Sequence, residues 1–275
     1  MICRVLLHMY FLFFALGLSA NEMKLPELPN FISLLYSKFS DVSWVVFLHN
    51  WESLFFSILV SIFVTLFFWL ASRKQDLIPS GIQNFIEWSV ENFQGYGTEI
   101  LSEDGKKYVP FLGTLFIFIL SMNWMVVIPL MKSPTSNLNI TAALAICVFV
   151  HIQFLNIRNQ GIKGFLYHLA GSPKDFMGWL IVPLILPIEL LTQFTRPLTL
   201  ALRLFGNVTG EDVMIGAAAM FGSLLLSTIS PIGLPLQIPF MFLALLTGLM
   251  QAMVFTLLTA IYILLSQSKA DEHIT

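Results

Sequence analysis

The sequence has few charged residues and few cysteines, and both shortages restrict what the protein can be. Only 11% of its 275 residues are charged and 57% are apolar. Soluble domains have roughly 25% charged and roughly 45–50% apolar residues. This composition excludes an ordinary soluble domain and indicates a protein embedded in lipid. The two cysteines, Cys3 and Cys147, are too few for a disulfide framework.

Basic residues and catalytic motifs are also in short supply. Fourteen Lys and Arg residues stand against sixteen Asp and Glu residues, a formal net charge of −2, so no basic surplus is available for a phosphate backbone. The five histidines are scattered, and the sequence has no H-E-x-x-H, G-x-G-x-x-G or Walker motif. We therefore expect no nucleic-acid partner, no cofactor, no bound metal and no catalysis by this chain alone.

The first twenty residues have the pattern of a secretory signal peptide. Arg4 precedes an apolar stretch over residues 5–18, and small residues follow it before a polar segment. Because Leu18 is large for the third position before a cleavage site, an uncleaved anchor helix is the alternative for residues 1–20. Both alternatives place the following segment, residues 21–48, outside the cytoplasm.

Long apolar runs fill the rest of the chain. A helix needs about 20 residues to cross the hydrocarbon core of a bilayer, so we expect one all-α, polytopic membrane domain with about five transmembrane helices after the signal-like segment. This domain covers residues 49–270, and its spans are predicted at 51–72, 108–131, 138–157, 178–228 and 236–267. The last two exceed an upright crossing, which predicts strong tilting or wrapping along a curved partner.

The loops between these spans predict the orientation of the chain. Most basic residues outside the signal lie in the loops after the first and third spans. Such loops face the cytoplasm, so the amino terminus is predicted outside and the carboxyl terminus inside. Between Pro79 and Leu101, apolar residues recur at helical spacing, which predicts an amphipathic helix at the cytoplasmic interface. A solvated connecting helix is the alternative.

Two arginines depart from this distribution of charge. Arg196 and Arg203 lie deep in the apolar stretch that begins at Phe176, whereas every other Lys and Arg is in the signal, a loop or a tail. An arginine at the centre of a membrane helix costs about 2.5–3.5 kcal/mol, and such residues usually face a protein interior or a wet cavity. Glu189 lies seven residues before Arg196, and Arg203 lies seven residues after it. On a helix these three charged side chains therefore form one stripe.

The two arginines differ in how readily a structural role explains them. For Arg196, an ion pair with Glu189 and a direct transport role are both open. Arg203 lies 28 residues beyond Asp175, about 40 Å along a straight helix, so its charge cannot easily reach the headgroups. A guanidinium stays charged when desolvated, favours the ionised form of a nearby carboxyl group, and blocks a direct leak of cations. Arg203 is therefore a candidate for ion transport.

The sequence around these arginines resembles the signature of the a subunit of F-type ATP synthases. The resemblance extends over nearly the whole chain after residue 45. Its motifs are Ile188-Glu189-Leu190-Leu191, Arg196-Pro197-Leu198-Thr199-Leu200-Ala201-Leu202-Arg203-Leu204-Phe205-Gly206-Asn207, Lys132-Ser133-Pro134-Thr135, Asn123, Gln251-Ala252 and Leu257-Leu258-Thr259-Ala260-Ile261-Tyr262.

The resemblance implies a proton-translocating stator subunit of the F0 sector, with two offset half-channels against a rotating c ring. It implies the b-subunit peripheral stalk as a further partner, and Arg203 as the arginine that faces each c-subunit carboxylate. For Asn123, a hydrogen bond to a neighbouring helix is an equal alternative to a place in the channel. The implied proton-translocation residues are Arg203, Glu189, Asp212, Gln251, Asn207, Glu211, Arg196 and Asn123.

The chain also departs from the family pattern. Members often carry an ionisable residue or glycine seven places before the glutamine, where this chain has Ala244, so Glu189 and Asp212 are expected to help complete the relay. Some members have an acid where Val126 stands.

A secondary ion-coupled transporter is the alternative function, although no paired halves are visible. Both H⁺ and Na⁺ are open as the ion, and the signal-like start with compact loops favours a bacterial inner membrane.

Overall fold

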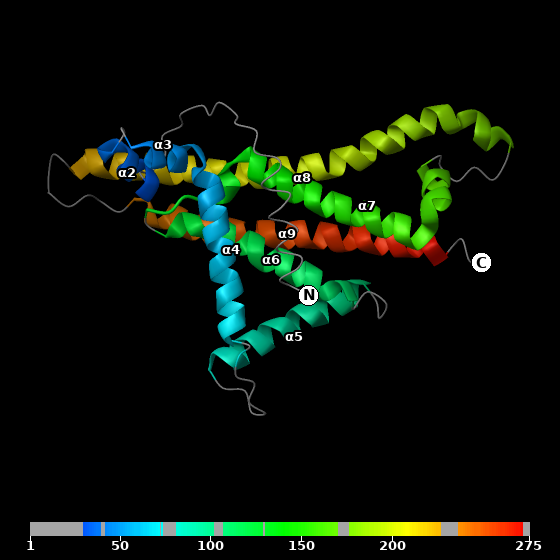
Figure 1. The fold of residues 1–275 in the computed structure, drawn as a ribbon, viewed down its shortest axis with the longest axis horizontal. Coiled ribbons are helices and arrows are strands. Elements are labelled where there is room, and N and C mark those ends of the chain that lie inside the picture. The colour runs from blue at the N-terminus through cyan, green and yellow to red at the C-terminus, as the bar shows by residue number, and fades with distance from the viewer. Residues whose placement is uncertain are drawn as a thin grey trace.

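Helices make up all the regular structure in the described part of the chain, as the composition predicts (Figure 1). The computed structural model describes residues 30–39, 42–71, 73, 81–101, 107–128, 130–169, 176–226 and 236–271. The elements are α2 (Phe31–Lys38), α3 (Ser43–Asn50), α4 (Glu52–Ala71), α5 (Ile82–Leu101), α6 (Val109–Trp124), η2 (Met125–Val127), η3 (Pro134–Ser136), α7 (Leu138–Leu169), α8 (Phe176–Leu226) and α9 (Ile238–Asp271). The signal-like residues 1–20 lie outside the described ranges.

Four helices are long and apolar enough to cross a membrane. They include Glu52–Leu70, Val109–Val127, Leu138–Arg158 and Ile238–Leu265, and each coincides with a predicted span. The fifth predicted span falls on α8, which is not among the four and which carries five charged residues along its 51 residues. The chain is thus a multi-pass helical membrane protein.

The last two predicted spans are each one helix, and neither is divided into two upright crossings. α8 has 51 residues and α9 has 34, which correspond to lengths of about 76 Å and about 51 Å. α7, α8 and α9 pack along one another, and α4 runs across their direction (Figure 1). If α4 stands upright in the bilayer, α8 and α9 must therefore be strongly tilted, as their lengths predict.

Two helices contain residues that usually break helices. α8 continues through Pro183, Pro187 and Pro197; each proline lacks a backbone N–H, and neighbouring groups in membrane proteins compensate for that loss. α7 is kinked at Gly161, where φ is 71° and ψ is 166°. Glycine tolerates this positive φ because it has no Cβ. The kink at Gly161 separates the predicted third span from the extension of α7 up to Leu169.

A buried apolar core joins α4, α6, α7, α8 and α9. Leu204 and Val208 are the α8 residues that are most deeply enclosed in it, and Ala252, Phe255 and Ile263 are their counterparts on α9. Because Leu204 and Val208 point into this core, the opposite side of α8 points outward. Other fully buried members are Phe56, Leu112, Leu115, Ile119, Met122 and Leu144.

The predicted amphipathic segment is the helix α5. Glu87 and Glu91 are exposed on it, and so are the apolar Trp88 and Val90. Phe93 faces the other way and packs on Phe116 of α6, with ring centroids 5.5 Å apart. The helix is thus confirmed, and its location at the cytoplasmic interface stays a prediction.

The described part of the predicted extracytoplasmic segment folds into α2 and α3. Asn30 caps α2 in a capping box with Ser33 and also donates a hydrogen bond to Glu52 at the start of α4. His49 Nδ1 lies 3.4 Å from the second Glu52 oxygen, and its ring stacks on Tyr36 at 4.4 Å. These contacts fasten the two short helices to the first predicted span.

Candidate ion-translocation site

Arg203 lies on the outer surface of α8, in an open groove. Its side chain is exposed, and among the described residues it forms no ion pair. The groove runs between α8 and α9, with Arg196 further along it and Leu258 and Tyr262 on the α9 side. A permanent cation is thus presented outward, where a partner rather than this chain can neutralise it.

Arg196 is held differently from Arg203. It is half-buried, and its guanidinium lies over the ring of Tyr262, 5.0 Å from the ring centroid. The ion pair with Glu189 that the sequence left open is not formed between these two described side chains. A cation–π contact with a tyrosine stabilises a guanidinium inside the membrane domain, so Arg196 is held by α9.

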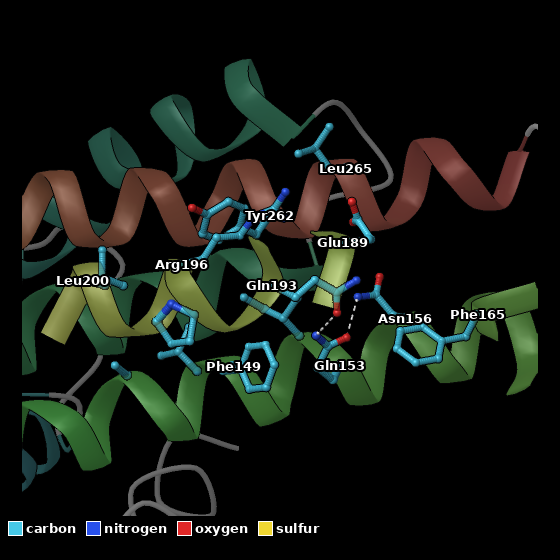
Figure 2. A pocket seen from close by; sticks show the side chains of 14 residues that line it. Phe149, Gln153, Asn156, Phe165, Glu189, Gln193, Arg196, Leu200, Tyr262 and Leu265 are labelled. Carbon is cyan, nitrogen blue, oxygen red and sulfur yellow. Dashed lines mark hydrogen bonds between the residues drawn. The ribbon is translucent and has the colours of Figure 1, made fainter. Parts of the chain in front are cut away.

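Glu189 and Arg196 share a polar cavity between α7, α8 and α9 (Figure 2). Gln153 Nε2 donates to Gln193 Oε1 at 2.8 Å, and Asn156 Nδ2 donates to Gln153 Oε1 at 3.2 Å. The cavity measures about 60 Å³, and one water molecule needs about 10–15 Å³ of such volume. It therefore has room for several water molecules beside the Glu189 carboxylate.

Three amides of this cavity were not singled out from the sequence. Gln153 and Asn156 are isolated polar residues near the end of an apolar span, and Gln193 follows Glu189 by one helical turn. A polar amide within an apolar run was the sequence feature that could have marked these three residues as part of the site. The pattern of one helix does not show that α7 and α8 bring the three side chains together.

On the other side of Arg203, two polar pairs connect α8 to α9. Asn207 is one turn after Arg203, and its Nδ2 donates to Gln251 Oε1 at 3.0 Å. One turn further on, Glu211 accepts a hydrogen bond from Thr247 Oγ1. Gln251 is only 4% exposed, and Glu211 is half-buried. The structure thus brings together three of the predicted residues and adds Thr247 to them.

Asp212 follows Glu211 on α8 and is half-buried. Adjacent residues on a helix point about 100° apart, so Asp212 cannot share the position of Glu211 against Thr247. The two acids that are adjacent in the sequence therefore have different surroundings, and the carboxyl group of Glu211 is hydrogen-bonded to Thr247 of α9.

Asn123 lies in a separate network that joins α6, η3 and α9. It is 1% exposed; its Nδ2 donates to the carbonyl of Gly248 at 3.2 Å, and its Oδ1 accepts from Thr135 Oγ1 at 2.9 Å. A Cβ on Gly248 would stand 3.1 Å from Asn123 Cβ, so the glycine permits this close approach. The arrangement favours the alternative in which Asn123 bonds a neighbouring helix.

These features define a class of protein. A multi-pass helical chain with an exposed arginine on a long, largely apolar helix, a polar cavity on one side of it and a half-buried carboxyl group on the other has the parts of an ion-translocating membrane protein. In the described residues, no cluster of three or more His, Cys, Asp or Glu side chains could hold a metal ion.

Comparison with known proteins narrows this class to one family. The ATP synthase A chain family matches residues 54–264. An ATP synthase subunit a from Protochlamydia amoebophila (strain UWE25) is 57% identical over 252 residues, 91% of this chain and 93% of that protein. One from Solidesulfovibrio magneticus is 41% identical over 197 residues, 70% of this chain and 75% of that protein. The chain therefore belongs to the ATP synthase A chain family.

The family membership confirms the resemblance noted from the sequence. The chain is a proton-translocating membrane subunit of the F0 sector and has no catalytic activity of its own. It functions with the c ring and the b subunit in the F0F1 complex. The alternative of a secondary ion-coupled transporter is not supported.

Proposed function

We propose that this chain conducts protons through two offset half-channels that are separated by Arg203 and joined only by rotation of the c ring. The observation that carries the proposal is the position of Arg203, which is exposed in an open groove between α8 and α9. The Glu189 cavity lies on one side of it, and the Asn207–Gln251 and Glu211–Thr247 pairs lie on the other.

The Glu189 cavity is the cytoplasmic half-channel in this proposal. α8 begins at Phe176, shortly after the basic residues Arg158, Lys163 and Lys174, which follow the third span, and basic segments between spans face the cytoplasm. The Glu211 and Asp212 end of the site then opens to the extracytoplasmic side. In this orientation α8 is a fifth, tilted span, the amino terminus is outside, the carboxyl terminus is inside, and the host membrane is a bacterial inner membrane.

Arg203 acts in the proposal as a fixed charge opposite a moving acid. Its guanidinium favours the ionised form of each c-subunit carboxyl group that reaches the groove, so the proton leaves into one half-channel. The same charge repels cations and prevents a direct leak between the two sides. Each elementary charge that crosses 100 mV releases about 2.3 kcal/mol, so the passage of several protons supplies the energy for one ATP.

Arg196 and Asn123 have supporting roles in the proposal. Arg196 contacts Tyr262 and lines both the cavity and the groove, so it keeps a positive charge at the inner end of the cytoplasmic half-channel. Asn123 bonds α9 one turn from Gln251 and maintains the offset of α6 and α9. Neither residue is required to exchange a proton.

The test replaces Arg203 with Ala and, separately, with Lys in the complete F0F1 complex in inverted membrane vesicles. We expect ATP-driven proton pumping to be lost in both variants, while ATP hydrolysis by the detached F1 head continues. Arg158→Ala, at an exposed position at the end of the Leu138–Arg158 span, is the matched control and should pump normally. Normal pumping by the Arg203→Ala complex would disprove the proposal. The same assay in buffer without Na⁺ tests which ion is transported. Pumping should continue there, because proton transport does not need Na⁺.

A further inference from the structure

Thr247 is the member of the Glu211–Thr247 pair that has no role predicted from the sequence. It lies on α9, one turn before Gln251, and its Oγ1 donates a hydrogen bond to Glu211 Oε1. The same Oγ1 is 2.9 Å from the carbonyl oxygen of Leu243 and 3.3 Å from that of Ala244. Its single hydroxyl proton thus has two kinds of acceptor, the carboxyl group of α8 and the backbone of α9.

This geometry suits both protonation states of Glu211. A hydroxyl has one donor and two acceptor lone pairs. When Glu211 is ionised, Thr247 donates to its Oε1. When Glu211 carries a proton on Oε2, its Oε1 is still an acceptor, and Thr247 keeps its hydrogen bond to that oxygen. Neither state leaves the hydroxyl without a partner, so the carboxyl group keeps its position through a protonation cycle.

The second oxygen of the carboxyl group is free for exchange. Within the described residues, Glu211 Oε2 is buried and has no hydrogen-bond partner, and the same holds for Gln251 Nε2 in the neighbouring pair. The two pairs are one helical turn apart, about 6 Å along the helices. One carboxyl oxygen is therefore held by Thr247, and the other has no hydrogen-bond partner among the described residues.

We propose that Thr247 is a positioning residue for Glu211, which it holds in both protonation states while Glu211 Oε2 gives and takes the proton. The pair combines a carboxyl group from α8 with a hydroxyl group from α9. The inference rests on the proposed function, in which Glu211 belongs to the extracytoplasmic half-channel.

The experiment measures the initial rate of ATP-driven proton pumping by intact F0F1 in inverted vesicles, per assembled complex. The variants are Thr247→Val, Thr247→Ser, Glu211→Gln and the double variant Thr247→Val with Glu211→Gln. Valine keeps the shape of threonine without its hydroxyl group, whereas serine keeps the hydroxyl group. We expect Thr247→Val to pump about tenfold more slowly, which is the effect of losing one charge-assisted hydrogen bond at a rate-limiting step, and Thr247→Ser to pump near the wild-type rate.

Thr256→Val is the matched control. Thr256 is buried on the same helix, and its hydroxyl bonds only to the Ala252 carbonyl of α9, at 2.8 Å, among the described residues. This variant should pump at the wild-type rate. In the Glu211→Gln background, Thr247→Val should cause no further loss, because Thr247 acts through the Glu211 carboxyl group.

The outcomes separate the inference from the function on which it rests. A slow Glu211→Gln complex together with wild-type pumping by Thr247→Val overturns the role of Thr247 and leaves the half-channel intact. An equal loss from Thr247→Val in both backgrounds, or no rescue by serine, assigns Thr247 to packing and also overturns its role. Wild-type pumping by Glu211→Gln removes Glu211 from the proton path and overturns the inference, whereas the proposed function is tested separately by Arg203→Ala.

Discussion

Asn123→Ala tests whether Asn123 holds helices together or carries protons. The substitution removes two hydrogen bonds, one to the Gly248 carbonyl of α9 and one from Thr135 of η3. Both partners keep other contacts: the Gly248 carbonyl lies inside a continuous helix, and Thr135 Oγ1 is 2.7 Å from Ser133 Oγ. The loss is therefore limited to the two contacts and the volume of the amide.

The expected magnitude follows from these contacts. Hydrogen bonds between membrane helices contribute about 0.6 kcal/mol on average, so two of them contribute about 1 kcal/mol. The cavity left by the amide at a site that is 1% exposed raises the total destabilisation to about 1–2 kcal/mol. The pumping rate of correctly assembled complexes should not change, because the acids that exchange protons in the proposed function are on α8.

The assay combines two measurements on the purified F0F1 complex. Resistance of the chain to unfolding by heat or SDS reports the stability, and pumping per assembled complex reports the function. Thr114→Val is the control on the same helix, because the Thr114 hydroxyl bonds only to the Phe111 carbonyl of α6 among the described residues. A normal stability combined with slow pumping by Asn123→Ala would refute the packing role and place Asn123 in the proton path.

Three further predictions concern other parts of the chain. Asp212→Asn should slow proton flow several-fold without stopping it, since Glu211 remains; an unchanged pumping rate would remove Asp212 from the path. Gly248→Ala should destabilise the chain by about 1–3 kcal/mol, because its Cβ would stand 3.1 Å from Asn123 Cβ; SDS resistance equal to that of wild type would contradict this. Asn30→Ala removes the α2 cap and a bond to Glu52, so α2 and α3 should be cut faster by protease added from the outside, while pumping stays normal.

Much of the helical layout could be predicted from the sequence. Apolar length predicted the segment 236–267, and α9 runs from Ile238 to Asp271. The prediction 178–228 is similarly close to α8, Phe176–Leu226, because its prolines do not end the helix. The third span was predicted to end at 157, whereas α7 continues past the kink at Gly161 to Leu169. The polar sequence after 157 indicated the end of the membrane crossing, which is not the end of the helix.

The side-chain partners within the site were less predictable. Arg203, Glu189 and Glu211 stand out because a charge in an apolar helix is rare. Thr247 gives no such signal, since a threonine in a membrane helix commonly bonds its own backbone. Its pairing with Glu211 depends on the rotation and the offset of α9 against α8. Those two quantities come from the packing of Leu204, Val208 and Phe255 in the shared core, and the periodicity of either helix alone does not contain them.

The location of Arg203 relative to the apolar surface explains why the proposed site needs a second protein. Leu191, Leu198 and Leu202 are exposed large apolar residues of the same helix, so the groove opens on a surface that avoids water. Lipid chains would bury the leucines, but placing the guanidinium in lipid costs about 2.5–3.5 kcal/mol. Water would hydrate the arginine but not the leucines. An apolar helix that carries one carboxyl group satisfies both, and a ring of such helices does so repeatedly as it turns, so the proposed ring contact completes the site.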